Sequence, residues 1–220
     1  MASAGDLDGD GLSEVLVTMR SATSRRLYTL TGASILSGSP DELSIYSTAS
    51  GGVSFGEAIA NIGPVHADGL DDFLIGEDED DEGANYSGSA WIYPGDSSGS
   101  FGWAAWLYGT EASAYLGSAL DGGEDLTDDG VADLLISAHK QDDGGSNAGG
   151  VWLVDATVTG EHPIEDVGTF ISGAAAGDYA GRSVALLGDI DGDGISDAAV
   201  GANGHDAGSD VDAGAVFVPV

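Results

Sequence analysis

Four aspartates lie close together in the stretch GDIDGDGISD, which runs from Gly188 to Asp197. Counted from Asp189, the carboxylates stand at positions 1, 3, 5 and 9, position 6 is Gly194, and position 7 is Ile195, whose main-chain carbonyl can act as a further ligand. Carboxylates at alternate positions of a tight loop can point inward together, and without a cation they would repel one another. Such a ring of hard oxygen atoms suits Ca²⁺, which takes about six to eight oxygen ligands.

Other metal sites fit this loop less well. An EF-hand requires a bidentate Glu at position 12 between two helices, but that position is Val200, and apolar runs typical of strands flank the loop. Mg²⁺ suits a flexible set of several carboxylates less well, and transition metals favour nitrogen or sulfur ligands, which the loop lacks. A single copy would fit a solvated acidic turn equally well, so the other copies of the motif decide the matter.

The acidic loop recurs with a period near sixty residues, in GDLDGDGLSEVLVT, GPVHADGLDDFLIG, EDLTDDGVADLLIS and GDIDGDGISDAAVG. The terminal acids of the four copies are separated by 58, 61 and 64 residues, and they are Glu14, Asp72, Asp133 and Asp197. Two further markers keep this spacing: a glycine 16 residues before the last three acids (Gly56, Gly117, Gly181) and an aromatic residue downstream of each loop (Tyr28, Trp91, Trp152, Phe217). Three markers in one register indicate an internal repeat.

The apolar runs within each unit are short and bounded by glycine, which predicts strands rather than helices. Four strands every sixty residues predict an all-β fold of propeller blades. We expect one segment over residues 1–220, with units at 1–50 (partial), 51–110, 111–173 and 174–220 (partial). The first unit is expected to lack the strand before its loop and the last to end after its third strand. That makes about 14 strands, or three and a half blades. Unpaired strand edges are then expected at Val15–Met19 or its neighbours and at Ala215–Val218.

Over almost its whole length the chain resembles FG-GAP repeats, the units of the seven-bladed β-propeller of integrin α-subunits and of many bacterial surface proteins. In that family a D-x-D-x-D-G-x-x-D loop joins the first two strands of a blade and binds calcium. The "GAP" part of the family signature is weak, because GED, SAH and GAN stand in its place.

The resemblance implies about three Ca²⁺ ions per chain. The implied ligands are Asp189, Asp191, Asp193, the Ile195 carbonyl and Asp197 in the fourth loop; Asp6, Asp8, Asp10, the Leu12 carbonyl and Glu14 in the first; and Asp125, Thr127, Asp129, the Val131 carbonyl and Asp133 in the third. The second loop has Pro64 and His66 at positions 1 and 3, which leaves Asp68 and Asp72, and it is expected to bind no ion.

Composition narrows the function classes. The chain of 220 residues has 38 acidic and 5 basic residues, for a net charge of -33, which argues against nucleic acid or an anionic membrane surface as partner. It has no cysteine and no apolar run near the length of a membrane span, and 42% hydrophobic residues favour a folded protein. No local arrangement in the sequence couples any of the four histidines to a nucleophile, and we expect no enzymatic activity. Asp81, Asp142 and Asp206 are equivalent in the repeat, and they are expected in solvated loops, with a second ion site as the alternative.

These observations predict a calcium-binding propeller module of an exported surface protein, with a binding or adhesion role. Two alternatives stay open: a scaffold that calcium only rigidifies, and an accessory propeller of a larger enzyme. The expected partners are a protein or glycan ligand and a second copy of the chain, whose association as a dimer would complete the ring. The extracellular or cell-surface location follows from the family resemblance.

Overall fold

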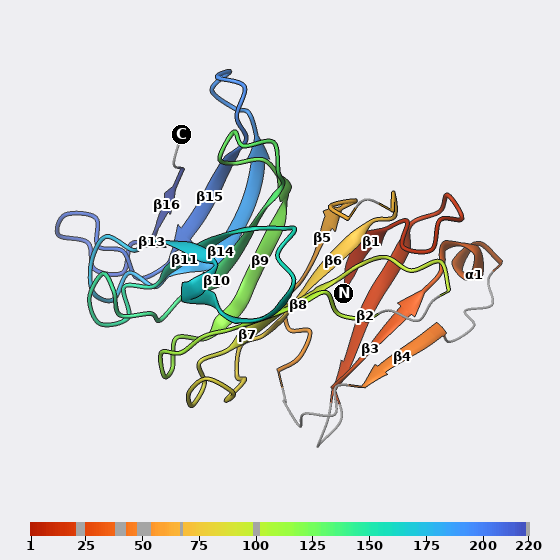
Figure 1. The fold of residues 1–220 in the computed structure, drawn as a ribbon. Helices are drawn as coiled ribbons and strands as arrows, with labels where there is room; N and C mark the ends of the chain where they lie inside the picture. The colour runs from red at the N-terminus through yellow and green to blue at the C-terminus, as the bar shows by residue number, and fades with distance from the viewer. Residues whose placement is uncertain (21–24, 38–42, 48–53, 67, 99–101, 219–220) are drawn as a thin grey trace.

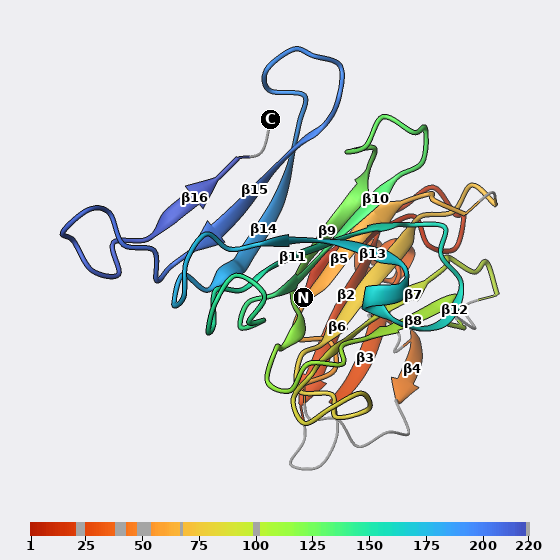
Figure 2. The same ribbon diagram turned by 60° about the vertical axis from the view of Figure 1, so that its left-hand side comes forward.

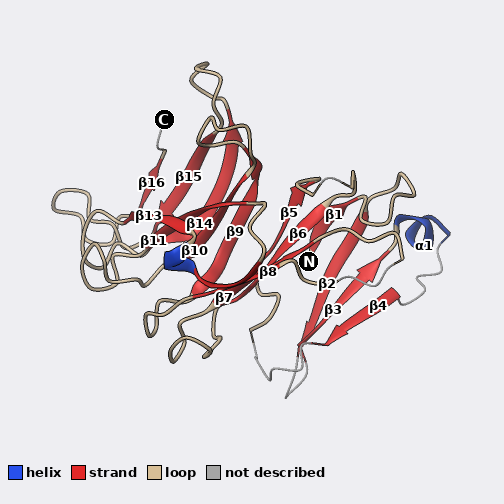
Figure 3. Ribbon diagram, viewed as in Figure 1, coloured by secondary structure: helices blue, strands red, loops and turns tan. Residues whose placement is uncertain are grey.

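The computed structural model describes residues 1–20, 25–37, 43–47, 54–66, 68–98 and 102–218. Its regular structure is almost entirely β, in four sheets that follow one another along the chain (Figure 1). The helical elements among these residues are short, namely α1 (Gly32–Ser37) and the 3-10 turn Ile164–Asp166, and they appear as the blue segments of Figure 3.

The sheets are built mainly from strands that are neighbours in sequence and pair antiparallel. The first contains β1 (Ala2–Gly5), β2 (Glu14–Arg20), β3 (Arg25–Leu30) and β4 (Leu43–Ser47) in that order. The second contains β5 (Ile59–Gly63), β6 (Asp72–Glu77), β7 (Ser89–Tyr93), β8 (Ala105–Tyr108) and β12 (Gly160–Pro163). The third contains β9 (Leu116–Glu124), β10 (Asp133–Ala138), β11 (Gly150–Asp155) and β13 (Gly168–Ser172), and the fourth β14 (Ala180–Gly188), β15 (Asp197–Ala202) and β16 (Ala215–Phe217).

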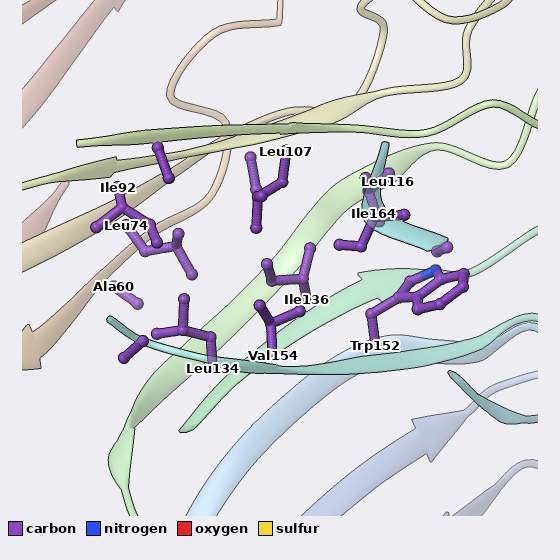
Figure 4. Packing of buried hydrophobic residues seen from close by; sticks show 14 of the residues in the cluster. Ala60, Leu74, Ile92, Leu107, Leu116, Leu134, Ile136, Trp152, Val154 and Ile164 are labelled. Carbon is purple, nitrogen blue, oxygen red and sulfur yellow. The ribbon is translucent and has the colours of Figure 1, made fainter. Parts of the chain in front are cut away.

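Hydrophobic clusters lie between successive sheets. In β10 every residue is buried, and alternate side chains point to opposite faces: Leu134 and Ile136 pack toward the second sheet, whereas Leu135 packs toward the fourth. The largest cluster joins the second and third sheets, where Leu134, Ile136 and Trp152 meet side chains of β5 to β8 (Figure 4). A strand covered on both faces requires a continuous apolar run, which explains why β10 reads DLLISA.

The marker glycines allow the first strands of neighbouring sheets to begin close to the preceding sheet. Gly117, at the start of β9, has a φ of 84°, and a Cβ there would collide with the main-chain oxygen of Ser89 in β7. Gly181, at the equivalent place in β14, has a φ of 86° and would collide with the oxygen of Gly150. Only glycine adopts this conformation without a steric penalty, so the repeated glycine has a direct structural cause.

The expectation that the first unit lacks its first strand is wrong. Ala2–Gly5 form β1, which pairs with β2 ahead of the acidic loop. Val15–Met19 therefore lie inside a sheet, between β1 and β3, and do not form an edge. The prediction missed β1 because the strand is only four residues long, ASAG, and has no apolar run.

The strand count also differs from the expected 14, because the described residues form 16 strands. One extra strand is β1, and the other is β12, which comes from the third unit and pairs in parallel with β8 of the second sheet. At the other end, β16 pairs with β15 alone among the described residues, as expected for Ala215–Val218, and it lies at the outer side of the fourth sheet in Figure 2. Of the aromatic row, Trp152 is buried, but Phe217 on this edge strand is 36% exposed.

Candidate metal centres

The four acidic loops occupy the same place in their sheets. Each joins the first strand to the second: β1 to β2, β5 to β6, β9 to β10 and β14 to β15. In each loop position 6 is a glycine with positive φ, between 79° and 96°, and they are Gly11, Gly69, Gly130 and Gly194. The position 5 carboxylate accepts a hydrogen bond from the position 7 amide in all four, at 2.8 to 3.0 Å. The turn is therefore the same whatever the charge of the loop.

The fourth loop brings three carboxylates together. Asp189, Asp191 and Asp197 each offer an oxygen atom within 4.8 Å of the other two. Asp189 accepts hydrogen bonds from the amides of Gly192 and Gly194 at 2.6 and 2.9 Å. The remaining expected carboxylate, Asp193, lies outside this group of three, and its Oδ1 accepts from the Ile195 amide.

The first loop gathers Asp6, Asp8 and Asp10 in the same way, with oxygen atoms within 4.8 Å of one another. Glu14 lies outside this group because both of its oxygens are engaged by the main chain: Oε2 accepts from the Leu7 amide at 2.7 Å and Oε1 from the Gly32 amide at 3.1 Å. The buried Glu14 therefore anchors the main chain around the loop and does not join the three gathered carboxylates.

The third loop has the same backbone pattern with one carboxylate fewer. Asp125 accepts from the amides of Thr127 and Gly130 at 3.1 and 2.8 Å, and Asp133 accepts from the Leu126 amide at 2.9 Å. Among the described residues no group of three carboxylates is gathered within 4.8 Å here, because position 3 carries the hydroxyl of Thr127.

The second loop replaces the carboxylate group with a histidine. His66 Nδ1 lies 3.0 Å from Asp72 Oδ2, which also accepts the His66 amide at 2.9 Å. The other oxygen of Asp72 accepts from the Gly95 amide at 2.8 Å, so its interactions are all with protein donors. Pro64 at position 1 has no side-chain oxygen, and the two hydrogen bonds that Asp189 makes in the fourth loop have no counterpart.

Burial and like charge act together on the terminal acids. Burial raises the pKa of Glu14, and the neighbouring carboxylates of Asp8 and Asp10 raise it further, against the opposing effect of the two amides. Burial likewise raises the pKa of Asp133, with Asp129 and Asp125 adding to the rise. In contrast, the pKa of the half-buried Asp125 is lowered, chiefly because its carboxylate accepts a hydrogen bond from the Gly130 amide. A cation beside the buried acids would relieve both the desolvation and the repulsion.

Neighbouring loops are also joined directly. The Asp71 amide, at position 8 of the second loop, donates to the main-chain oxygen of Asp6 at 3.0 Å, and the Ser196 amide donates to that of Asp125 at 3.4 Å. Asp71 Oδ2 additionally accepts the Asp6 amide at 2.7 Å. Sequence reasoning gave Asp71 no role, although it is the only carboxylate at position 8 among the four loops, where the others have Ser13, Ala132 and Ser196.

These donor sets are chemically uniform. Carboxylate, hydroxyl and main-chain oxygens at the expected spacing are ligands for a hard cation, and the first and fourth loops could each bind a metal ion through three gathered carboxylates. The residues at hand therefore fit the ion that the sequence predicts.

Asp81, Asp142 and Asp206 stand in the loops after the second strand of each sheet. Each accepts a hydrogen bond from an amide five or six residues later in its own loop, from Tyr86, Asn147 and Asp212 at 2.7, 2.7 and 2.9 Å. These contacts explain their equivalence as closure of a turn. Among the described residues they belong to no group of three metal-ligating side chains.

The comparison with known proteins gives a partial likeness. No protein-family model matches the chain. Integrin alpha-X of Homo sapiens is 36% identical to it over 89 residues, which are 40% of this chain and 8% of integrin alpha-X. The chain therefore spans a small fraction of that relative's length, and the likeness supports the integrin-like repeat over less than half of the chain. No helix of the described residues has the length and apolar character needed to cross a bilayer.

Proposed function

We propose that the chain is a calcium-binding β-propeller segment of FG-GAP type. The observation that carries the proposal is the recurrence of one loop at one end of four successive sheets, with three carboxylates gathered in two of the copies. The stacking of each sheet on the next through an apolar layer, and the contact of β1 with β5, β5 with β9 and β9 with β14, support an arrangement of blades.

Calcium is the ion that these loops favour. The ligands are oxygens alone, and they lie in loops whose length and flexibility suit Ca²⁺ better than the strict octahedron of Mg²⁺. We propose sites in the first, third and fourth loops and none in the second, where His66 already contacts Asp72.

A binding or adhesion role on an exported surface protein is the function we favour for the module. The partial likeness to integrin alpha-X supports this role. Exposed aromatic residues, Trp103 at 43% and Tyr86 at 41%, offer contact surface that a purely structural array would not need. The purely structural scaffold and the accessory propeller of a larger enzyme are the alternatives, and we propose no catalytic activity for the chain itself.

Association of two copies is the second part of the proposal. On the edge strand β16, Val216 is 68% exposed and Phe217 36% exposed, and pairing this edge would bury them and satisfy main-chain groups. Calcium should favour the dimer because each chain carries a net charge of -33. Light scattering in calcium checks this, and a monomer at every protein concentration would contradict it.

Isothermal titration tests the metal proposal. We expect Ca²⁺ to bind with measurable heat and Mg²⁺ to bind far more weakly under the same conditions. An absence of binding heat for Ca²⁺, with an unchanged circular dichroism spectrum as evidence of folding, would overturn the proposed calcium sites.

A further inference from the structure

The end of the sheets opposite the acidic loops carries a small cationic surface. Lys140 lies two residues after the end of β10, whereas the acidic loop precedes that strand, and Arg182 lies near the start of β14, whereas the acidic loop follows that strand. They are two of only five basic residues in a chain of net charge -33. Neither forms an ion pair with a carboxylate within the described part of the chain. Unpaired cations in so acidic a protein call for an explanation.

Basic residues do not occupy the equivalent positions in the other repeat units. The residues six and seven after the terminal acid are Asp78 and Glu79 in the second unit, His139 and Lys140 in the third, and Asn203 and Gly204 in the fourth. The residue after the marker glycine is Glu57, Ser118 and Arg182 in the same order. The fold accepts acids at these positions, so the basic residues are not required by the blade.

Arg182 is held by a network of hydrogen bonds. Arg182 Nη1 lies 3.4 Å from His139 Nε2, and His139 Nδ1 lies 2.8 Å from the hydroxyl of Ser118, which is 2.9 Å from that of Ser137. A guanidinium can only donate, so Nε2 accepts and Nδ1 carries the proton. Burial is the largest cause that lowers the pKa of His139, to about 4, and the charges of Arg182 and Lys140 lower it further. The imidazole is therefore a neutral support for Arg182 and leaves other guanidinium donors of this exposed residue open.

Lys140 is positioned by two tyrosines. Its ammonium lies 4.2 Å from the ring centroid of Tyr115, which is stacked on Tyr86 with centroids 5.9 Å apart. Both tyrosines have positive φ, 58° for Tyr115 and 54° for Tyr86, which is unusual for bulky residues. Asp81 holds the Tyr86 amide, and the Tyr86 carbonyl accepts the Tyr115 amide at 3.2 Å. The turn therefore holds the two tyrosine rings in place before any ligand binds.

We propose that Lys140, Arg182, Tyr86 and Tyr115 form a recognition surface for the carboxylate of an aspartate or glutamate on a protein partner. This rests on the proposed binding role of the module and names its ligand chemistry, independently of the calcium sites. A cation with open donors binds a carboxylate through charge-assisted hydrogen bonds, and the fixed tyrosines reduce the entropy lost on binding.

The surroundings select against other anions. Glu111 accepts the amide of Asp142, which with Asp143 follows Lys140 closely in sequence, so carboxylates lie beside this cation and repel a polyanion more strongly than a single carboxylate. An acidic sugar stacks its ring on an open aromatic face, and the Tyr115 ring beside the cations already contacts both Tyr86 and Lys140. A protein side chain requires only the cations and a contact with the edge of the tyrosine pair.

Nuclear magnetic resonance titration of the calcium-loaded protein tests the surface. The probe is N-acetyl-aspartate amide, with N-acetyl-asparagine amide as the neutral isostere and glucuronate as an acidic sugar. We expect saturable shifts confined to Tyr86, Tyr115, Lys140 and Arg182 at about millimolar aspartate probe, and none with the asparagine probe.

Three variants complete the test. Lys140→Ala and Arg182→Ala should each weaken binding of the aspartate probe at least about fivefold, because each removes one charged donor. Arg26→Ala, which removes an exposed cation from β3 of the first sheet, should leave binding unchanged. Equal shifts with the asparagine probe, tighter binding of glucuronate, or the same affinity in Arg182→Ala would each overturn the inference. Such outcomes, with calcium binding intact by titration calorimetry, would leave the metal proposal standing.

Discussion

The second and fourth acidic loops are two versions of one structure. Both join the first two strands of a sheet, turn at a glycine with positive φ, and use the position 5 aspartate to accept the position 7 amide, at 3.0 Å for Asp68 and 2.8 Å for Asp193. They differ at positions 1 and 3, where Pro64 and His66 replace Asp189 and Asp191. The comparison shows that the turn does not depend on the carboxylates that would bind an ion.

The acid at position 9 also has a structural role that does not depend on a metal ion. Asp72 and Asp197 are both buried, and each accepts a main-chain amide of its own loop. Its presence in every loop is therefore explained by structure, and it does not identify a metal site. The acids at positions 1 and 3 carry that information, because these are the two carboxylates of the fourth loop that the second loop lacks.

Removal of calcium should produce the largest effect. An ion that binds only the folded chain stabilises it by about 2.7 kcal/mol at a hundredfold excess over Kd, and three sites together should raise Tm by at least about 10 °C. Scanning calorimetry of calcium-stripped and calcium-saturated protein measures the shift. Identical melting temperatures would show that the loops hold themselves together without ions.

A matched pair of variants separates the ion from the turn. Asp193→Ala and Asp68→Ala remove equivalent carboxylates that make equivalent hydrogen bonds. In calcium-free buffer both should lose about 1 kcal/mol of unfolding free energy. In calcium, Asp193→Ala should lose about 2–3 kcal/mol more, because the fourth site is weakened. Denaturant unfolding in both buffers provides the measurement, and equal losses in calcium would remove the distinction between the two loops.

The second loop should also be convertible. Pro64→Asp with His66→Asp restores carboxylates at positions 1 and 3 beside Asp68 and Asp72, and we expect one additional Ca²⁺ per chain. Pro64→Ala with His66→Asn is the control, since it removes the same contacts without adding charge. Titration calorimetry counts the ions, and an unchanged count in the double aspartate variant would mean that the loop lacks more than its ligands.

The smallest effect concerns pH in the absence of calcium. Because the pKa values of Glu14 and Asp133 are raised, the folded chain binds these protons more tightly than the unfolded chain does. Their contribution favours folding below the ordinary carboxyl range and is lost as pH rises through the raised values. Glu14→Gln should therefore lose less stability than wild type as the pH rises from the ordinary carboxyl range toward neutrality in calcium-stripped buffer. Calcium should reverse the trend, because protons then compete with the ion.

Much of the fold follows from the sequence because its cause is local. Gly117 and Gly181 indicate a backbone conformation that other residues avoid, and the run DLLISA indicates a strand that is covered on both faces. The segments ASAG (β1) and GEHP (β12) form strands only because neighbouring strands pair with them. Neither segment has a local pattern that predicts this pairing, so the sequence did not predict these two strands.

The sequence predicted the candidate ligands of the site but not how they are grouped in space. Ligand types follow from spacing, but the grouping of Asp189 and Asp191 with Asp197, rather than with Asp193, depends on which oxygens the amides occupy. The pairing of His139 with Arg182 joins residues 43 apart in sequence, and no local pattern could predict it. The scarcity of basic residues was the one signal in the sequence that pointed to it.

Native mass spectrometry of the calcium-loaded chain tests the central claim most directly, because it counts bound ions on each molecule. The account predicts three Ca²⁺ ions per chain for wild type and for Asp68→Ala, and two for a variant in which Asp189 and Asp191 are both changed to Asn. Four ions in wild type, or the loss of one in Asp68→Ala, would contradict the assignment of the second loop as the one without an ion.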